Sequence, residues 1–287
     1  MTTRRIDDER VLNCCRFQLD LSRPRIMAVL NVTSDSFSGD GLAGRFDKAL
    51  RQAEAAVEAG ADILDVGGES SRPGAAPVSV QEEMDRVLPL VERLARWAVP
   101  VSVDTVKPQM MQTAVRAGAA MINDIAGFRA EGAIEAVAGS GVALCVMHMQ
   151  GEPRTMQCSP YYDDVVGEVE RFLLERVAGL RAAGVEASRL VLDPGFGFGK
   201  TLEHNLALLS SLPRLAAHGY PVLAGLSRKS MLGAITGRPV SERVVASAAA
   251  ALLAAQRGAA IIRVHDVAET RDALAVLRAL SEFEGSR

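Results

Sequence analysis

The chain has 287 residues, of which 48% are hydrophobic and 23% are charged. This composition supplies enough core for one large α/β domain or two ordinary ones. The formal net charge of −3 gives no electrostatic case for nucleic acid or an anionic membrane as a partner. The four cysteines include no C-x-x-C pair, so we expect free thiols in a reducing compartment.

Signals for export or membrane insertion are not predicted. Residues 1–10 are charged and contain no apolar segment of the kind that a signal peptide needs. The longest uncharged helical run, 244–256, is rich in alanine and too short to span a bilayer. We therefore expect a soluble cytoplasmic protein with no membrane partner.

A regular rhythm of strands and helices begins near Arg25. The strands are apolar nearly throughout rather than alternating, which is typical of parallel strands covered on both faces. Several predicted helices end just before a glycine, a favoured residue after a helix C-terminus. The predicted strands are 26–31, 63–66, 99–103, 120–123, 142–147, 190–192, 221–224 and 260–264, and the predicted helices are 47–59, 80–97, 108–117, 131–138, 163–183, a helix starting at 202, 241–256 and 268–280.

Eight strand–helix units in one chain match a single (β/α)8 barrel, the TIM barrel, which we place at residues 25–287. A doubly wound open sheet is the runner-up, but that fold usually carries G-x-G-x-x-G after its first strand and none is present. Residues 1–24 form a short N-terminal extension. Weak strand character at 10–21 suggests strands at the bottom of the barrel.

Nearly every predicted strand ends in a residue that can hold a ligand. The carboxyl ends of all barrel strands converge on one mouth, where barrel enzymes place their active sites. One or two polar strand ends would only reflect contact with solvent, whereas an almost complete set favours a binding site. These residues are Asn31, Gly67 with Glu69, Asp104, Asn123, His148, Asp193, Ser227 with Arg228 and Lys229, and Arg263 with His265.

The strand-end residues fall into two chemical groups. Asp104, Asn123 and Asp193 offer hydrogen-bond acceptors and one amide, which suit a flat heterocycle rich in N–H groups. Lys229, Arg263 and His265, together with Arg228, follow the last two strands, where barrels often bind phosphate. The residues therefore predict a ligand that combines a polar heterocycle with a phosphate group.

A glycine-rich stretch follows Asp193. Gly195, Gly197 and Gly199 alternate with phenylalanines, so the backbone can turn sharply and approach a ligand. The run Gly195-x-x-x-Gly199-Lys200-Thr201 is similar to a phosphate-binding P-loop, but it has three residues between the glycines where that motif needs four. We favour Asp193 itself as the ligand group over an Asp that only caps the following loop.

Two polar loops follow the first two barrel strands, at 31–41 and 69–75. Long polar loops with glycine at a barrel mouth behave as lids over a bound substrate. Phe37 and Arg72 stand out in these otherwise small and polar stretches, which ordinary surface loops would not explain.

Taken together in order, these motifs resemble the dihydropteroate synthase family, the folate-pathway enzymes that sulfonamides inhibit. Any single motif is weak, but the ordered set is specific and runs from near residue 25 to the last helix. The matching stretches are 26–38, Asp65-Val-Gly-Gly-Glu-Ser-Ser-Arg-Pro-Gly74, Ser102-Val-Asp-Thr105, Ile122-Asn-Asp124, Met147-His-Met149, Asp193-Pro-Gly-Phe-Gly-Phe-Gly-Lys200, Ser227-Arg-Lys-Ser230 and Arg263-Val-His-Asp266.

The resemblance implies a homodimeric barrel that condenses 6-hydroxymethyl-7,8-dihydropterin diphosphate with 4-aminobenzoate, releasing diphosphate and requiring Mg²⁺. It assigns three groups of residues. Asp104, Asn123, Asp193 and Lys229 would hold the pterin; Asn31, as the metal ligand, with Arg263 and His265 would hold the diphosphate and Mg²⁺; and Phe37, Ser71, Arg72, Phe198 and Ser230 would shape the aminobenzoate site. The resemblance names Asn31, Arg72, Lys229, Arg263 and His265 as catalytic.

Small departures from the family pattern lie in the two loops. Ser34 stands where the family usually has proline, Gly39-Asp40-Gly41 replaces the commoner Asp-Gly-Gly, and Ser71 replaces threonine. These changes bear on loop stiffness and inhibitor sensitivity rather than on the reaction. Two other functions stay open: a methyltransferase that passes a methyl group from a reduced folate to a corrinoid protein, and a catalytically inactive pterin-binding scaffold.

Overall fold

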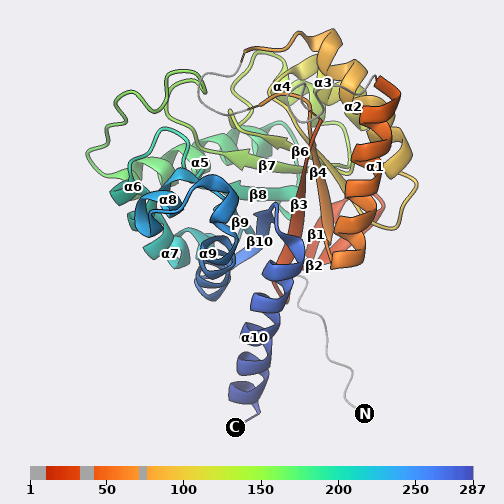
Figure 1. Ribbon diagram of the computed structural model, residues 1–287. Coiled ribbons are helices and arrows are strands. Elements are labelled where there is room, and N and C mark those ends of the chain that lie inside the picture. Colours follow the sequence, from red (N-terminus) through yellow and green to blue (C-terminus); the bar gives the residue numbers. More distant parts are fainter. Residues whose placement is uncertain (1–10, 33–41, 71–75, 287) are drawn as a thin grey trace, which may run out of the picture.

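Parallel strands form the centre of the molecule in the computed structural model, which describes residues 11–32, 42–70 and 76–286 (Figure 1). The barrel strands are β3 (Arg25–Asn31), β4 (Ile63–Gly67), β5 (Val101–Asp104), β6 (Met121–Asp124), β7 (Ala143–Met147), β8 (Leu190–Asp193), β9 (Val222–Ala224) and β10 (Ala259–Val264). Within the described residues, these eight strands close in the order β10-β3-β4-β5-β6-β7-β8-β9, with every neighbouring pair parallel. The predicted (β/α)8 barrel is confirmed.

Helices surround the barrel between successive strands (Figure 1). They are α1 (Leu42–Ala59), α2 (Val80–Leu94), α3 (Pro108–Arg116), α4 (Ala133–Val137), α5 (Val165–Ala182), α6 (Leu202–Ser210), α7 (Leu212–Ala216), α8 (Ser230–Thr236), α9 (Val244–Gln256) and α10 (Val267–Gly285), with short 3₁₀ turns at Ala187–Arg189 and Val240–Glu242. The short helices α7 and α8 were not predicted. None of the helices in the described part of the chain is both long and apolar enough to cross a membrane.

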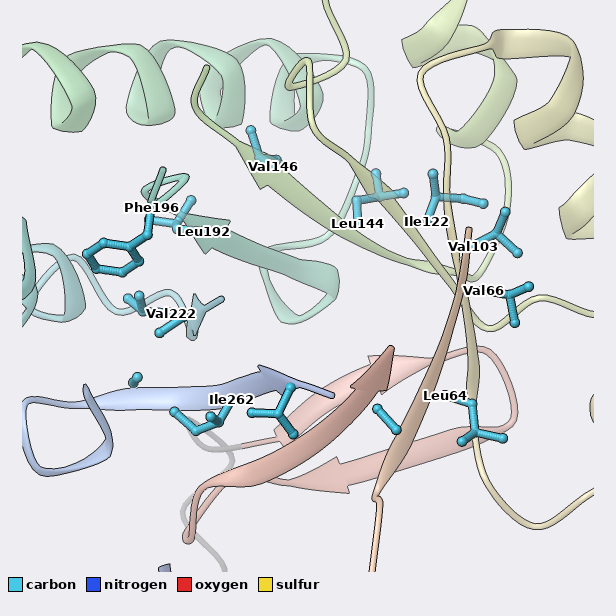
Figure 2. Close-up of a cluster of buried hydrophobic side chains, with 14 of the residues drawn as sticks. Leu64, Val66, Val103, Ile122, Leu144, Val146, Leu192, Phe196, Val222 and Ile262 are labelled. Carbon is cyan, nitrogen blue, oxygen red and sulfur yellow. The ribbon is translucent and has the colours of Figure 1, made fainter. Parts of the chain in front are cut away.

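Alternation along each strand separates two apolar layers. Side chains such as Leu64, Val66 and Ile122 belong to the large cluster between the barrel wall and the helices (Figure 2). Residues of the other parity, such as Ile63 and Met121, belong to a second cluster inside the barrel. Because successive side chains point to opposite faces of a strand, residues two positions further along these strands also face the interior, nearer the mouth.

An N-terminal hairpin, made of β1 (Val11–Cys14) and β2 (Phe17–Asp20), covers the end of the barrel opposite the mouth. Its Leu12 and Cys14 are fully buried in the interior cluster with Ile63, the first residue of β4. The amide of Cys15 donates to the carbonyl of Gly141, just before β7, at 2.8 Å. The hairpin therefore closes the lower end of the interior and leaves the mouth as its open end.

Candidate active site

The acidic side of the mouth is formed by Asp104, Asn123 and Asp193, at the ends of β5, β6 and β8. Asn123 and Asp193 are buried, and Asp104 is partly exposed. The carboxylate of Asp193 accepts the backbone N–H of Gly195 at 2.7 Å, so Pro194 and Gly195 turn the chain tightly around it. These three of the four predicted pterin-holding residues thus face the barrel interior near its mouth.

Arg263 of β10 lies against this acidic side. Its Nη2 donates to Oδ2 of Asp104 at 2.9 Å, and its Nε donates to Oδ2 of Asp65 at 2.7 Å. The positive charge of Arg263 also acts on Asp193, whose pKa it lowers against the larger effect of burial. The cationic residue of the last strand and the acidic residues of the middle strands therefore share one site, as the sequence predicted.

Lys229 adds a second cation to the same site. It follows β9 at the start of α8, and its Nζ lies 4.0 Å from the ring centre of Phe198 in a cation–π contact. Burial, followed by the charge of Arg263, lowers the pKa of Lys229 to about 8. The ring of Phe198, which is buried, and the ammonium of Lys229 are thus held next to each other at the mouth.

Burial raises the pKa of the carboxylates at this site. The pKa of Asp193 rises to about 6 because burial outweighs the hydrogen bond from Gly195 and the nearby charge of Lys229. The pKa of Asp104 rises for the same reason, although the charge of Arg263 opposes the shift. Groups that titrate near neutral pH for such reasons are typical of functional sites.

His265 lies exposed at the rim, beside Ser227. Ser227 Oγ accepts the backbone N–H of His265 at 3.2 Å and lies 3.0 Å from its Nδ1, so the hydroxyl hydrogen is free to point to Nδ1. Partial desolvation and then the charge of Arg263 lower the pKa of His265, which favours the neutral ring. A neutral ring with Nδ1 as acceptor presents Nε2–H as a donor.

Arg228, which the sequence grouped with the anion-binding cations, is already paired. Its Nε donates to Asp266 at 3.0 Å, and its backbone has a positive φ of 59°. The pair secures the rim between β9 and α10. Lys229, Arg263 and His265 are therefore better placed than Arg228 to meet an anion.

A buried lysine, Lys200, fixes the glycine-rich loop after β8. Its Nζ lies 2.9 Å from the carbonyls of Gly195 and Phe198 and 3.0 Å from Nδ1 of His148. The sequence placed His148 at the rim, but the structure shows that it is 7% exposed and stacked edge-on against Phe172. Burial, and then the charge of Lys200, lower the pKa of His148 to about 3, so it stays neutral and acts as a structural acceptor.

Asn31 ends β3 beside Gly67 and Asp104. A methyl group built at Gly67 would lie 3.8 Å from Asn31 Oδ1 and 3.6 Å from Cβ of Asp104, so Gly67 keeps room between them. No group of three or more His, Cys, Asp and Glu side chains that could hold a metal ion occurs in the described ranges. An oxygen from Asn31 suits Mg²⁺, which commonly takes only one or two protein ligands and completes its shell with substrate phosphates and water.

A cleft of about 310 Å³ opens beside Asp104. Lys107 bridges two carboxylates on its wall, Glu69 at the start of the second loop and the buried Glu83 of α2. The other wall includes Ile125 and the segment around Met149. The cleft therefore extends from the acidic residues toward the loops at the mouth.

Several predicted residues cannot be placed. Phe37, Ser71 and Arg72, with most of the two predicted lid loops, lie outside the described residues. Ser230 is the first residue of α8 and is exposed next to Lys229. Phe198 is the remaining predicted aminobenzoate-site residue, and it lies within the site as described above.

Two residues in the site were not predicted from the sequence. Asp65 is fully buried inside β4 and hydrogen-bonds both Arg263 and Asn123. The sequence did contain a signal for Asp65. A charged residue in an otherwise apolar strand, two positions before the strand ends, must face the barrel interior. Lys200 was read as part of a possible P-loop, whereas its ammonium is turned inward onto the loop that carries it.

The fold and the charged mouth define a (β/α)8 barrel enzyme. Comparisons with known proteins identify its family. Residues 27–265 match the family model described as pterin binding enzyme. The dihydropteroate synthase of Escherichia coli (strain K12) is 50% identical over 271 residues, covering 94% of this chain and 96% of that protein. The chain belongs to the dihydropteroate synthase family of pterin-binding enzymes.

Solved structures of the same family have closely similar folds. The Burkholderia cenocepacia dihydropteroate synthase complexed with 7,8-dihydropteroate is 53% identical, with a TM-score of 0.89 over 96% of this chain and 98% of that one. The Yersinia pestis enzyme in a sulfonamide drug complex is 49% identical, with a TM-score of 0.90 over 95% of this chain and 99% of that one.

Proposed function

We propose that this protein is a transferase that condenses 6-hydroxymethyl-7,8-dihydropterin diphosphate with 4-aminobenzoate to give 7,8-dihydropteroate and diphosphate. The observation that carries the proposal is the meeting of acidic and cationic groups at one barrel mouth. Arg263 pairs with Asp104, and Lys229 lies on the Phe198 ring beside them. Family membership supports the same reaction, since the dihydropteroate synthase of Escherichia coli (strain K12) is 50% identical to this chain over 271 residues.

The pterin subsite is formed by Asp104, Asn123 and Asp193. A pterin edge presents several N–H groups, and ionised carboxylates accept such donors in strong, paired hydrogen bonds. Asn123 Oδ1 is buried and has no hydrogen-bond partner within the described residues, so it offers an acceptor of the right kind. Lys229, at the edge of the same subsite, would donate to a ring oxygen or nitrogen.

The diphosphate subsite is formed by Arg263, His265 and Asn31. Arg263 and the Nε2–H of neutral His265 supply donors for an anion, and the positive charge favours the growing charge on the leaving group. Asn31 would hold Mg²⁺ together with the diphosphate oxygens. When bound, the metal would neutralise part of the diphosphate charge.

We propose that diphosphate departs before the amine attacks. The pterin ring delocalises positive charge from its exocyclic methylene, and Asp104 and Asp193 stabilise a cationic ring. An arylamine is neutral at pH 7, so no strong general base is needed. Rapid-quench samples with pterin diphosphate and no aminobenzoate should show diphosphate release; an absolute need for aminobenzoate before any bond cleavage would instead support direct displacement.

Product analysis tests the overall reaction most directly. Purified protein incubated with pterin diphosphate, 4-aminobenzoate and Mg²⁺ should form 7,8-dihydropteroate, and removal of the metal with a chelator should slow the reaction. The methyltransferase alternative has no use for Lys229, Arg263 and His265 as an anion-binding group. Inorganic pyrophosphate should therefore promote pterin retention here, and an absence of product in the complete mixture would contradict the proposed reaction.

The acceptor subsite is proposed next to Phe198 and Ser230, completed by Phe37, Ser71 and Arg72 of the two loops. A neutral arylamine packs favourably on an aromatic ring, and Lys229 is close enough to meet a charged or polar edge. Since the Yersinia pestis relative is described with a sulfonamide drug, we propose that sulfonamides compete with 4-aminobenzoate at this subsite.

A homodimer is proposed through α8, α9 and α10. Large apolar side chains on these helices are exposed, including Val245 at 82% and Val276 at 69%. Helix α9 consists largely of alanine, so a partner can approach its backbone closely. Helix α9 lies beside both α8 and α10 (Figure 1). We place the second copy on the exposed apolar side chains of these helices.

Light scattering after gel filtration tests the dimer. Val245→Glu places a charge on the proposed interface and should shift the protein toward the monomer while the barrel stays folded. Ala178→Glu, at an exposed position of α5 beside β7 and β8, is the matched control and should leave the mass unchanged. Equal masses for wild type and Val245→Glu would place the interface elsewhere.

A cytoplasmic location is proposed from the state of the thiols. Cys14, Cys15, Cys145 and Cys158 are all free, and free thiols are the usual state in a reducing compartment. Fractionation of cells that produce the protein would test this proposal.

A further inference from the structure

Asp65 is a charged group inside the barrel wall that the proposed reaction does not yet use. It lies in β4 between two outward-facing residues, Leu64 and Val66, and its exposure is 0%. Alternation along the strand directs its side chain into the barrel, toward the same interior as Ile63. An ionised carboxylate is costly to bury unless it is paired and hydrogen-bonded, so its partners define its role.

One oxygen of Asp65 joins two site residues from distant strands. Oδ2 accepts Nε–H of Arg263 at 2.7 Å and Nδ2–H of Asn123 at 3.2 Å. Arg263 is on β10 and Asn123 is on β6. Three strands, β3, β4 and β5, lie between β10 and β6 in the barrel, so the two site residues do not come from neighbouring strands. The Nη2 of Arg263 donates to Asp104, so hydrogen bonds fix the guanidinium at two atoms, Nε and Nη2.

The bond to Asp65 also decides which end of the Asn123 amide faces the ligand. One N–H of the amide nitrogen is donated to Asp65, which fixes Oδ1 on the other side of the amide as an acceptor. Oδ1 has no hydrogen-bond partner in the part of the chain that the structure describes. A flipped amide would place two oxygens against each other, so Asp65 disfavours that orientation. Asn123 therefore presents its oxygen as an acceptor for an N–H of the ligand, with one of its two amide N–H groups held by Asp65.

We propose that Asp65 is a positioning residue that acts through Arg263 and Asn123. It fixes the guanidinium that meets the diphosphate, and it selects the amide orientation that recognises an N–H of the pterin ring. This inference rests on the proposed function. The competing explanation is that Asp65 only fills the interior, as Ser102 does at the paired position of β5, where its hydroxyl is also buried without a partner among the described residues.

Steady-state kinetics of Asp65→Asn and of the control Ser102→Ala separate these explanations. Asp65→Asn keeps the size of the side chain but removes its charge. Loss of a charge-assisted hydrogen bond corresponds to a roughly 10- to 100-fold decrease in kcat/KM for pterin diphosphate. The KM for 4-aminobenzoate should stay within about twofold of wild type, because Asp65 has no hydrogen bond to Phe198 or Ser230, the described residues of the acceptor subsite. Ser102→Ala should resemble wild type. Equal behaviour of the two variants would overturn the inference.

A double-mutant cycle with Arg263→Ala tests whether Asp65 acts through Arg263. Residues that share one hydrogen bond give non-additive effects, whereas independent residues give additive ones. Asp65→Asn should therefore cost much less in the Arg263→Ala background than in wild type, and additive losses would contradict the proposal. If Asp65→Asn does not fold, the smaller neutral variant Asp65→Ser carries the same cycle.

Binding of 6-hydroxymethyl-7,8-dihydropterin without its diphosphate isolates the Asn123 part of the proposal. Calorimetry should show a weaker complex for Asp65→Asn than for Ser102→Ala, since only the former frees the Asn123 amide to turn. An unchanged affinity of Asp65→Asn for the dihydropterin would show that Asp65 does not act through the Asn123 amide. If wild type makes dihydropteroate but all variants match it, the inference alone fails; if wild type makes no product, the proposed reaction fails first.

Discussion

At the scale of single residues, the charge of Asp193 is the feature that should matter most for pterin binding at the proposed subsite. Its carboxylate is buried at the end of β8, holds the Gly195 amide with one oxygen, and has Lys229 and Arg263 nearby as opposing charges. The remaining oxygen is available to a ligand. A buried carboxylate in this position binds an N–H donor strongly because little water competes for it.

Asp193→Asn should weaken binding of the dihydropterin by roughly 2–3 kcal/mol, because the substitution keeps the shape but removes the charge of a charge-assisted pair. Titration calorimetry would measure the change. Asp272→Asn, on the exposed face of α10, is a control that should bind as wild type does. An unchanged affinity for Asp193→Asn would refute the assignment of Asp193 to the pterin.

The same residue makes binding depend on pH. Burial raises the pKa of Asp193 to about 6, so the free protein takes up a proton there as the pH falls through that value. A protonated carboxyl loses its charge, and affinity for the uncharged dihydropterin should therefore decrease from pH 7.5 to pH 5. The decrease should be smaller in Asp193→Asn, where Asp104 is the one carboxylate of the pterin subsite that still titrates; a pH profile identical to that of wild type would contradict this cause.

The location of a residue at the mouth could be predicted where its side chain ends a strand, and less well where it lies inside one. Asp104, Asp193 and Arg263 were recognised because the carboxyl ends of barrel strands meet by geometry alone. Asp65 was not recognised, because its position in the interior depends on which face of β4 it occupies. Its hydrogen-bond partners come from two other strands, β6 and β10. His148 was placed at the rim, whereas tertiary packing against Phe172 buries it.

At the scale of elements, the glycine-rich loop after β8 is held by its backbone conformation. Gly195 has a φ of +68°, and a methyl group added to it would lie 1.9 Å from the carbonyl oxygen of His148. Lys200 draws the same loop inward through the carbonyls of Gly195 and Phe198. The loop therefore places Phe198 and the Asp193 carboxylate through contacts that no larger residue at position 195 permits.

Gly195→Ala should destabilise the protein by about 3 kcal/mol or more, since it adds a backbone clash to the strain of a positive φ. Gly219→Ala is the matched control: its φ is +80°, but a methyl group there meets nothing within 4 Å. It should cost only about 1 kcal/mol. Urea denaturation monitored by circular dichroism would compare them, and equal losses would show that the contact with His148 is not limiting.

Elements were predictable from sequence where apolar periodicity is long, and less so where a helix is short. All eight barrel strands were recognised, with ends that differ by one or two residues. Helix α6 ends at Ser210 and α7 starts anew at Leu212, because Pro213 lacks the N–H needed to continue a helix but fits a first turn. Helix α8 has only seven residues, too few to show a period.

At the scale of the whole molecule, the interior of the barrel has an apolar layer that stabilises the fold and a polar layer that belongs to the site. The lower layer is apolar and is completed by Leu12 and Cys14 of the N-terminal hairpin. The upper layer holds Asp65, Asn123 and Arg263, which form the inner part of the site. Because the hairpin closes the end opposite the mouth, it can support the fold without contacting a substrate.

Leu12→Ala should therefore lower the free energy of unfolding by about 2–5 kcal/mol while the folded protein keeps its activity. The side chain is 0% exposed, and its removal leaves a cavity under the barrel that the rigid strands cannot collapse to fill. Leu206→Ala on α6, a helix outside the proposed dimer surface where the side chain is 44% exposed, should change stability by no more than about 0.5 kcal/mol. Urea denaturation gives the stabilities, and turnover at a temperature where both variants are folded gives the activities. A Leu12→Ala protein that is as stable as Leu206→Ala would mean that the barrel closes its own lower end and that the hairpin only rests against it.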